Sequence, residues 1–274
     1  MKKSTKTKRM LMWTIYDALL DLIPENLMVH DCQAGVNWTF ARSLGVGLAM
    51  TPLEGERRLT RAGSIAGTPL RRLAEYIKSW NNLEAAVGLA AINSAINAPQ
   101  EIQNAFDRCL DDFPKGNVFD CMLGELRGKK VGVVGHFQGL ERVAAVCESL
   151  TILERRPLPG DLPDSACEYV LPDQDYVFIT ATTLINKTLP RLLALSEHAQ
   201  VVLVGPSTPM TPLFFDFGIK VLAGMTVVNE IALCRSIQEG GDVHSFESGT
   251  RKIFAGYENA KTLDVNSRMA DTYR

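Results

Sequence analysis

The chain has 274 residues, of which 46% are hydrophobic and 22% are charged, and its formal net charge is −2. This length and hydrophobic content are typical of one large or two modest domains with a substantial buried core. A nearly neutral chain offers no electrostatic basis for binding nucleic acid, so we expect no nucleic-acid partner. The six cysteines include no C-x-x-C pair, which favours reduced thiols and a cytoplasmic location.

The N-terminal segment carries basic residues before an apolar stretch, as a signal peptide would. Asp17 and Asp21 interrupt that stretch, and no small-residue cleavage site follows it. Leu11, Ile15 and Leu19 instead recur at the spacing of one helix face. Because no apolar run is long enough to span a bilayer, we expect a soluble protein without a membrane partner.

Residues 27–35 and 36–51 are predicted strands, and the second is rich in β-forming and small residues. Gly45 and Gly47 indicate a bulge or a close approach of another backbone. Such strands favour an antiparallel hairpin or meander. Helices are predicted after them over 69–80, 83–97 and 100–110. We therefore expect an α+β domain over residues 10–112.

The helix predicted over 83–97, LEAAVGLAAINSAIN, is unusually rich in small residues and can pack closely against a sheet. Asn93 and Asn97 are four residues apart and hence lie on one face of it. The two amides either line a cleft between domains or end the helix, and the sequence leaves both interpretations open.

The segment DDFPKG, 111–116, is the predicted linker, and a short helix over 118–126 follows it. The next stretch, KKVGVVGHFQGLERVAAVCESLTILERRP, predicts a strand at 131–134, a glycine turn, a helix at 140–149 and a strand at 151–153. This order is the opening unit of a nucleotide-binding fold. Further strands at 175–180, 200–204 and 220–223 alternate with helices at 188–198 and 228–238. The sequence therefore predicts a Rossmann-like domain with a mainly parallel sheet over 118–255, and an α/β fold class.

The dinucleotide fingerprint G-x-G-x-x-G would need glycines at 135, 137 and 140, whereas the chain has Gly135, Phe137 and Leu140. Since Phe137 would keep a pyrophosphate away from the backbone, we expect the fold without tight dinucleotide binding. Glu154 ends the second strand of the unit. It either accepts hydrogen bonds from a ligand hydroxyl or is a solvated acid paired with a neighbouring arginine.

The carboxyl ends of parallel strands meet at one edge of a sheet, and ligands bind there. The candidate ligand-binding residues at this edge are Gly135, His136, Glu154, Thr180, Thr182, Thr183, Asn186, Gly205, Ser207 and Thr208. Most of them are neutral, which suits holding a polar small molecule better than strong acid–base chemistry. His136 could contact a ligand or a metal, or be structural, and each of the others could be an ordinary turn or capping residue. The sequence assigns no catalytic residue, metal ligand or cofactor.

Several strings resemble a known family. The second half of the chain resembles the Rossmann-like domain of the bacterial and archaeal proteins described as "putative heavy-metal chelation". The strings that carry this resemblance are, in order, VGVVGHF, ILERRP, TATTLINKT, VLVGPSTP and IKVLAG. The first half resembles the N-terminal domain of the same proteins, whose fold is similar to the N-terminal domain of enolase. The strings that carry this resemblance are NWTFARSLGVGLAMTP, RAGSIAGTPLRRLAEYI and LEAAVGLAAINSAIN. The resemblance covers about residues 10–240. It implies two domains with a ligand site between them and a role in handling metals or a metal chelator.

Three functions are consistent with these observations. The first is a small-molecule binding protein or enzyme of heavy-metal chelation or metal-chelator metabolism, with its ligand between the two domains. The second is a nucleotide- or S-adenosylmethionine-dependent enzyme that uses Glu154 for the ribose hydroxyls, and the third is a direct metal-ion-binding protein. The expected partner is a small-molecule ligand, such as a metal chelator, and a homodimer is kept open. The sequence does not decide whether the protein catalyses a reaction.

Overall fold

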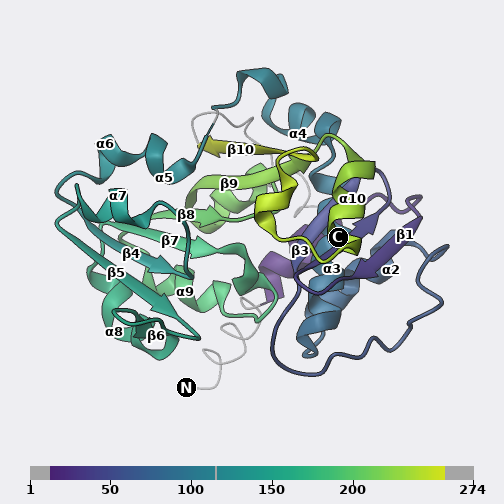
Figure 1. Ribbon diagram of the computed structural model, residues 1–274, viewed down its shortest axis with the longest axis horizontal. Helices are drawn as coiled ribbons and strands as arrows, with labels where there is room; N and C mark the ends of the chain where they lie inside the picture. The colour runs from purple at the N-terminus through teal and green to yellow at the C-terminus, as the bar shows by residue number, and fades with distance from the viewer. Residues whose placement is uncertain (1–12, 115, 257–274) are drawn as a thin grey trace, which may run out of the picture.

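The computed structural model describes residues 13–114 and 116–256 and shows two sheets side by side (Figure 1). The first half of the chain forms a three-stranded antiparallel sheet, and the second half forms a seven-stranded, mainly parallel sheet. The expected α/β fold class is therefore confirmed. Within the described ranges, no helix is long and apolar enough to cross a membrane.

The small sheet is a meander, as its strand pattern predicts. Its strands are β1 (Asp31–Ala34), β2 (Trp38–Arg42) and β3 (Val46–Met50). The predicted strand over 36–51 is in fact two strands, because Ser43 N donates to Gly45 O and the chain turns there. The helices that follow are α2 (Leu70–Ala74), the 3₁₀ helix η1 (Glu75–Lys78), α3 (Asn82–Ile96) and α4 (Pro99–Phe106).

A further helix, over residues 13–21, precedes the small sheet. Ile15 and Leu19 are buried on its inner face, as their spacing predicts. Leu11 and the basic residues before it lie outside the described residues.

Helix α3 is buried on all sides. Asn81 caps its N-terminus, and every residue from Ala85 to Ile96 is buried. Neighbouring backbones come very close to it at two glycines. A Cβ atom on Gly47 would lie 2.1 Å from Ser94 N, and one on Gly88 would lie 2.1 Å from Ile77 N. The close backbone approach predicted at Gly47 is therefore confirmed.

The large sheet has the strand order β10-β9-β8-β7-β4-β5-β6, and only β9 and β10 pair antiparallel. The strands are β4 (Lys130–Val134), β5 (Ser149–Glu154), β6 (Leu162–Pro163), β7 (Tyr176–Thr180), β8 (Gln200–Val204), β9 (Ile219–Val227) and β10 (Thr250–Gly256). From β6 to β9 this is the doubly wound Rossmann order, whose direction reverses between β4 and β7. The parallel pairing of β4 with β7 agrees with the strands predicted at 131–134 and 175–180.

Short helices precede β4 or connect the strands of the large sheet. They are η2 (Leu110–Asp112), α5 (Val118–Cys121), α6 (Leu123–Leu126), α7 (Leu140–Ala144), η3 (Asp164–Ala166), α8 (Cys167–Val170), η4 (Leu171–Asp173), η5 (Ala181–Leu184), α9 (Leu189–Leu195), η6 (Pro212–Phe217), α10 (Glu230–Gln238) and η7 (Val243–Phe246). Most predicted helices are present with shifted ends, although the one predicted over 118–126 is divided into α5 and α6.

Two elements differ more strongly from the prediction. Helix α7 is much shorter than the helix predicted over 140–149, because the residues after it bond to the turn before β4: Gly128 N donates to Val146 O, and Glu148 N donates to Lys129 O. Strand β9 continues to Val227 and pairs with β10, which is not predicted. Only alternate residues of β10, such as Ile253 and Ala255, are fully buried, as in an edge strand.

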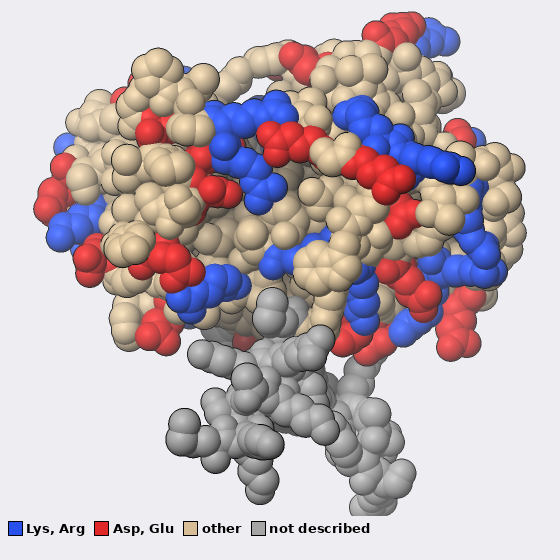
Figure 2. Space-filling view, turned by 90° about the horizontal axis from the view of Figure 1, so that it is seen from below, with Lys and Arg blue, Asp and Glu red and all other residues tan. Residues whose placement is uncertain are grey.

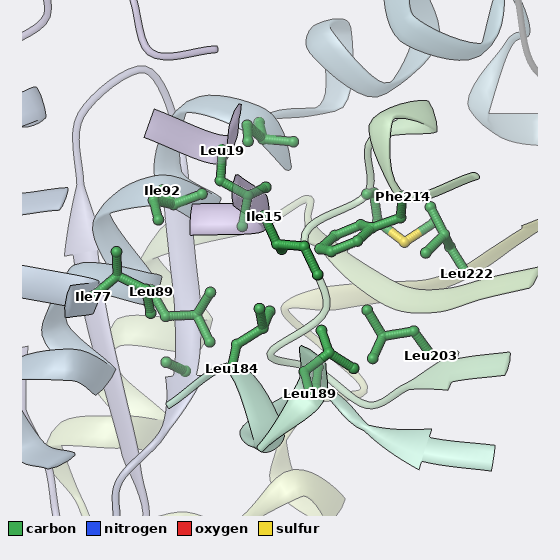
Figure 3. Close-up of a cluster of buried hydrophobic side chains, with 14 of the residues drawn as sticks. Ile15, Leu19, Ile77, Leu89, Ile92, Leu184, Leu189, Leu203, Phe214 and Leu222 are labelled. Carbon is green, nitrogen blue, oxygen red and sulfur yellow. The ribbon is translucent and has the colours of Figure 1, made fainter. Parts of the chain in front are cut away.

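The two halves share one hydrophobic core. The cluster in Figure 3 joins Ile15, Leu19, Ile77, Leu89 and Ile92 from the first half to Leu184, Leu189, Leu203, Phe214 and Leu222 from the second. The hydroxyl of Tyr16 also donates to Leu184 O across this contact, at 3.2 Å. The domain ranges 10–112 and 118–255, and the likeness of the first half to the N-terminal domain of enolase, stay predictions.

We expect Gly47→Ala to lower the free energy of unfolding by about 3 kcal/mol or more, since the added methyl group would overlap the backbone of α3 and one element would have to move. Urea denaturation measures the change. Gly124→Ala is the matched control, because no other heavy atom lies within 4 Å of a Cβ there. It should alter stability by less than about 1 kcal/mol. Equal effects of the two changes would contradict the role of Gly47.

Candidate functional site between the two halves

A cavity of about 660 Å³ lies at the carboxyl ends of the parallel strands and is lined by both halves of the chain. The small-sheet half contributes Trp38, Met50, Leu53 and Glu54 to the lining. Residues after β4, β5, β7 and β8 contribute from the other half. The cavity therefore includes the point between β4 and β7 where the strand order reverses, the place where doubly wound sheets bind ligands.

The structure brings most of the candidate ligand-binding residues to this cavity. Those that line it are Gly135, His136, Glu154, Thr180, Thr182, Thr183, Asn186, Gly205 and Ser207. Thr208, Asn93 and Asn97 are not among its lining residues; they are buried in the contact between the halves.

The turn after β4 is tight. Gly135 has a φ of +106°, and a Cβ atom there would lie 3.1 Å from the side chain of Thr180. Phe137 packs against Phe119, with ring centroids 5.5 Å apart, and its ring edge also lies beside Gly135. An aromatic ring thus occupies the place where the dinucleotide fingerprint has its second glycine. His136, between these residues, is 43% exposed and faces the cavity.

The loop after β7 is held by its own hydroxyls. Thr180 Oγ1 lies 3.0 Å from Thr182 Oγ1, and Thr183 Oγ1 donates to Thr180 O at 2.6 Å. Asn186 Oδ1 accepts from the amide and the hydroxyl of Thr188. These contacts fix the loop while its threonines and Asn186 line the cavity.

Lys187 anchors the same loop to the small-sheet half. Its φ is +64°, its side chain is buried, and its Nζ donates to Ser79 O and Ile185 O beside the ring of Trp80. Burial lowers the pKa of Lys187 to about 8.

The loop after β8 joins the halves. Ser207 Oγ accepts from Met50 N at 2.9 Å, whereas Thr208 is fully buried and its hydroxyl donates to Ala223 O. Asn93 Nδ2 donates to Leu48 O and Ser207 O.

Asn97 also joins the halves through its side chain. Its Nδ2 donates to Thr208 O at 2.8 Å and lies 3.4 Å from Met225 O, and its Oδ1 accepts from Met210 N at 2.7 Å. Asn97 also stands at the C-terminal end of α3, as one of the two interpretations of the asparagines has it. In addition, the side chains of Asn93 and Asn97 join α3 to the large-sheet half, which neither interpretation included.

Charged side chains of opposite sign pair at the rim of the cavity. Arg155 Nε lies 3.3 Å from Asp164 Oδ2, and Arg156 Nε lies 2.8 Å from Glu54 Oε1 on the other half. Glu154 Oε1 accepts from the backbone amides of the two arginines and not from their guanidinium groups. Figure 2 shows a hollow on one face of the molecule with basic and acidic side chains gathered at its edge.

Several lining residues were not predicted. Trp38, Met50 and Glu54 come from the first half, and Lys252 and Phe254 come from β10. No local pattern places them beside residues more than a hundred positions away. Cys167 also lines the cavity, and burial, together with the charge of Asp164, raises the pKa of its thiol to about 11. In the part of the chain that the structure describes, no group of three or more histidine, cysteine, aspartate and glutamate side chains could hold a metal ion.

Comparison with known proteins agrees with this fold. A family profile described as "Putative heavy-metal chelation" matches residues 117–255, and a second profile with the same description matches residues 16–96. The chain belongs to this family. The resemblance drawn from the sequence strings is therefore confirmed.

Three similar proteins illustrate the family. An uncharacterized protein of Methanocaldococcus jannaschii is 30% identical over 192 residues, 67% of this chain and 71% of the relative. A crystal structure of a protein of unknown function from Desulfitobacterium hafniense is 38% identical, with a TM-score of 0.81 over 89% of this chain and 98% of its own. A protein of unknown function from Pyrococcus horikoshii, 22% identical, has a TM-score of 0.75 over 90% and 99% of the two chains and shows the shared fold.

We expect Asn97→Ala to lower the free energy of unfolding by about 3 kcal/mol, because it removes the partners of Thr208 O and Met210 N in a buried contact. The exposed Asn104 is the matched control, and Asn104→Ala should change stability by about 0.5 kcal/mol or less. Chemical denaturation of both variants checks this. A small effect at Asn97 would mean that the contact between the halves does not depend on this amide.

We expect Cys167 to resist alkylation by iodoacetamide at pH 8 in the folded protein, since a thiol with a pKa of about 11 is roughly one part in a thousand thiolate there. The exposed Cys109 should be modified first. Peptide mass spectrometry gives both rates, and unfolding the protein should make the two thiols react alike. Equal rates in the folded protein would show that Cys167 is not buried as described.

Proposed function

We propose that this protein binds a small organic molecule in the cavity between its halves, and that the molecule takes part in heavy-metal chelation as a metal chelator or as its precursor or product. The observation that carries the proposal is the cavity itself. Its volume of about 660 Å³ lies within the usual range for small-molecule sites. Its walls combine apolar side chains with a few convergent polar groups, which is the composition of such sites.

The polar groups can donate hydrogen bonds to a ligand. Ser207 Oγ already accepts from Met50 N, so its own proton can point to a ligand. Asn186 uses its oxygen for Thr188, and its NH₂ group has no partner among the described residues. These donors suit carbonyl or carboxylate oxygens, which are also the atoms by which organic chelators hold metal ions.

Two features argue against the nucleotide-dependent alternative. Helix α7 has five residues, too short to offer the aligned N-terminus that binds a pyrophosphate in dinucleotide-binding folds. The ring of Phe137 also lies beside Gly135, where a pyrophosphate would approach the backbone. Glu154 still ends β5, as a ribose-binding acid would, so a bound nucleotide is one outcome that the following experiment can detect.

Native mass spectrometry of the protein as purified tests the proposal. We expect a non-covalent adduct that denaturation releases as an organic molecule. Replacing Thr182 by tyrosine should abolish the adduct, because the larger side chain would fill part of the cavity that Thr182 lines. Thr14→Tyr, on the exposed side of the first helix, is the matched control and should keep the adduct.

The released material separates the alternatives. Absorbance near 260 nm would identify a nucleotide, and elemental analysis would identify a metal ion bound without an organic molecule. Either result, or an adduct of equal occupancy in Thr182→Tyr and the wild type, would contradict the proposal. The control against unfolding is the thermal midpoint, which should be similar in the two tyrosine variants.

A further inference from the structure

His136 has a carboxylate partner that lies outside the cavity lining. Its Nδ1 is 3.3 Å from Asp161 Oδ2, and the Asp161 side chain is only 4% exposed, whereas the imidazole is 43% exposed. His136 lines the cavity and Asp161 does not. One ring nitrogen is therefore turned to a buried carboxylate, and the opposite side of the ring is available to the cavity.

Asp161 is fixed by the turn in which it lies. Asp161 N donates to Leu158 O at 2.9 Å, and Leu158 N donates to Asp161 Oδ2 at 3.0 Å. Gly160, with a φ of +100°, permits this turn between β5 and β6. The carboxylate is consequently fixed by its own turn, with Oδ2 at 3.3 Å from Nδ1 of His136.

The neighbouring carboxylate influences which nitrogen of a neutral imidazole carries the proton. A carboxylate only accepts hydrogen bonds, so it favours the proton on Nδ1 and leaves the lone pair on Nε2. Carboxylates behind histidine rings orient functional imidazoles in this way in metal sites and in catalytic triads. Nε2 of His136 is then a basic nitrogen presented to the cavity.

We propose that His136 is the proton acceptor of the cavity and that Asp161 is its positioning residue. In this inference, which rests on the proposed function, the ligand carries a weakly acidic O–H or N–H group that faces Nε2. The proton passes from that group to Nε2, the ring becomes an imidazolium balanced by the Asp161 carboxylate, and the ligand keeps the electron pair. Chelators coordinate metal ions through deprotonated donor atoms, so an acceptor at this place suits that class of molecule.

Two-bond ¹⁵N NMR spectra of the histidine side chains at pH 8 test the arrangement, with His136→Gln used to assign the signal. We expect the Nδ1–H tautomer for His136 in the wild type and a clear loss of it in Asp161→Asn. Asp173→Asn, which replaces an exposed aspartate of η4, should leave the wild-type tautomer unchanged. A proton on Nε2 in the wild type, or no change in Asp161→Asn, would overturn the proposal.

Modification by diethylpyrocarbonate tests the availability of the lone pair, since this reagent attacks an unprotonated ring nitrogen. We expect the rate at His136 to fall severalfold in Asp161→Asn. His198, whose side chain is 80% exposed, serves as the internal reference and should keep its rate. A loss of reactivity at both histidines would indicate a general structural change and would contradict a specific role for Asp161.

The two proposals fail separately. If an organic molecule co-purifies with the wild type but the His136 tautomer is Nε2–H, the proposed function stands and the acceptor role is wrong. If His136 shows the expected tautomer and reactivity but no organic molecule binds, the acceptor arrangement stands and the ligand proposal is wrong. When both hold, His136→Gln should reduce the occupancy of the co-purified molecule.

Discussion

The close packing of α3 is the constraint on which the rest of the structure depends. This helix is buried on all sides, and two neighbouring backbones approach it so closely that no side chain fits between them: β3 approaches through Gly47, and η1 approaches at Gly88 of the helix itself. One face of the helix therefore carries the small sheet, and the amides of Asn93 and Asn97 reach the loops of the large sheet. The cavity is lined by residues of both halves that this packing brings together.

Polar residues at this contact have two different roles. Thr208 and Asn97 are fully engaged with backbone groups, as buried polar atoms must be if their desolvation is to be offset. Ser207, one residue away from Thr208, both contacts Met50 N and lines the cavity. The hydroxyl of Ser207 consequently joins the halves and lines the cavity, whereas that of Thr208 bonds within the large-sheet half.

The distribution of charge gives the cavity its chemical character. The two arginines after β5 pair with Asp164 and Glu54 at the rim, so their charges are largely balanced there. Neutral hydroxyls, the amide of Asn186 and apolar side chains line the rest of the cavity, together with the charged side chains of Glu154 and Lys252. Against that background the His136–Asp161 pair is distinctive, because its carboxylate is buried and its ring is not.

The sequence by itself determined the strand–turn–helix unit around Gly135, the meander, the buried α3 and the loops at the carboxyl edge, because hydrophobic periodicity and glycine turns are local signals. It also carried the family resemblance. Only the tertiary structure decided which hydroxyls face the cavity, that Asn97 joins the halves, that α7 ends after five residues, and that Asp161 lies behind His136. Most of these features depend on contacts between residues that are 25 to more than 100 positions apart in the chain. The end of α7 depends on backbone hydrogen bonds to the turn before β4, which replace those of a longer helix. Neither kind of contact can be predicted from a local sequence pattern.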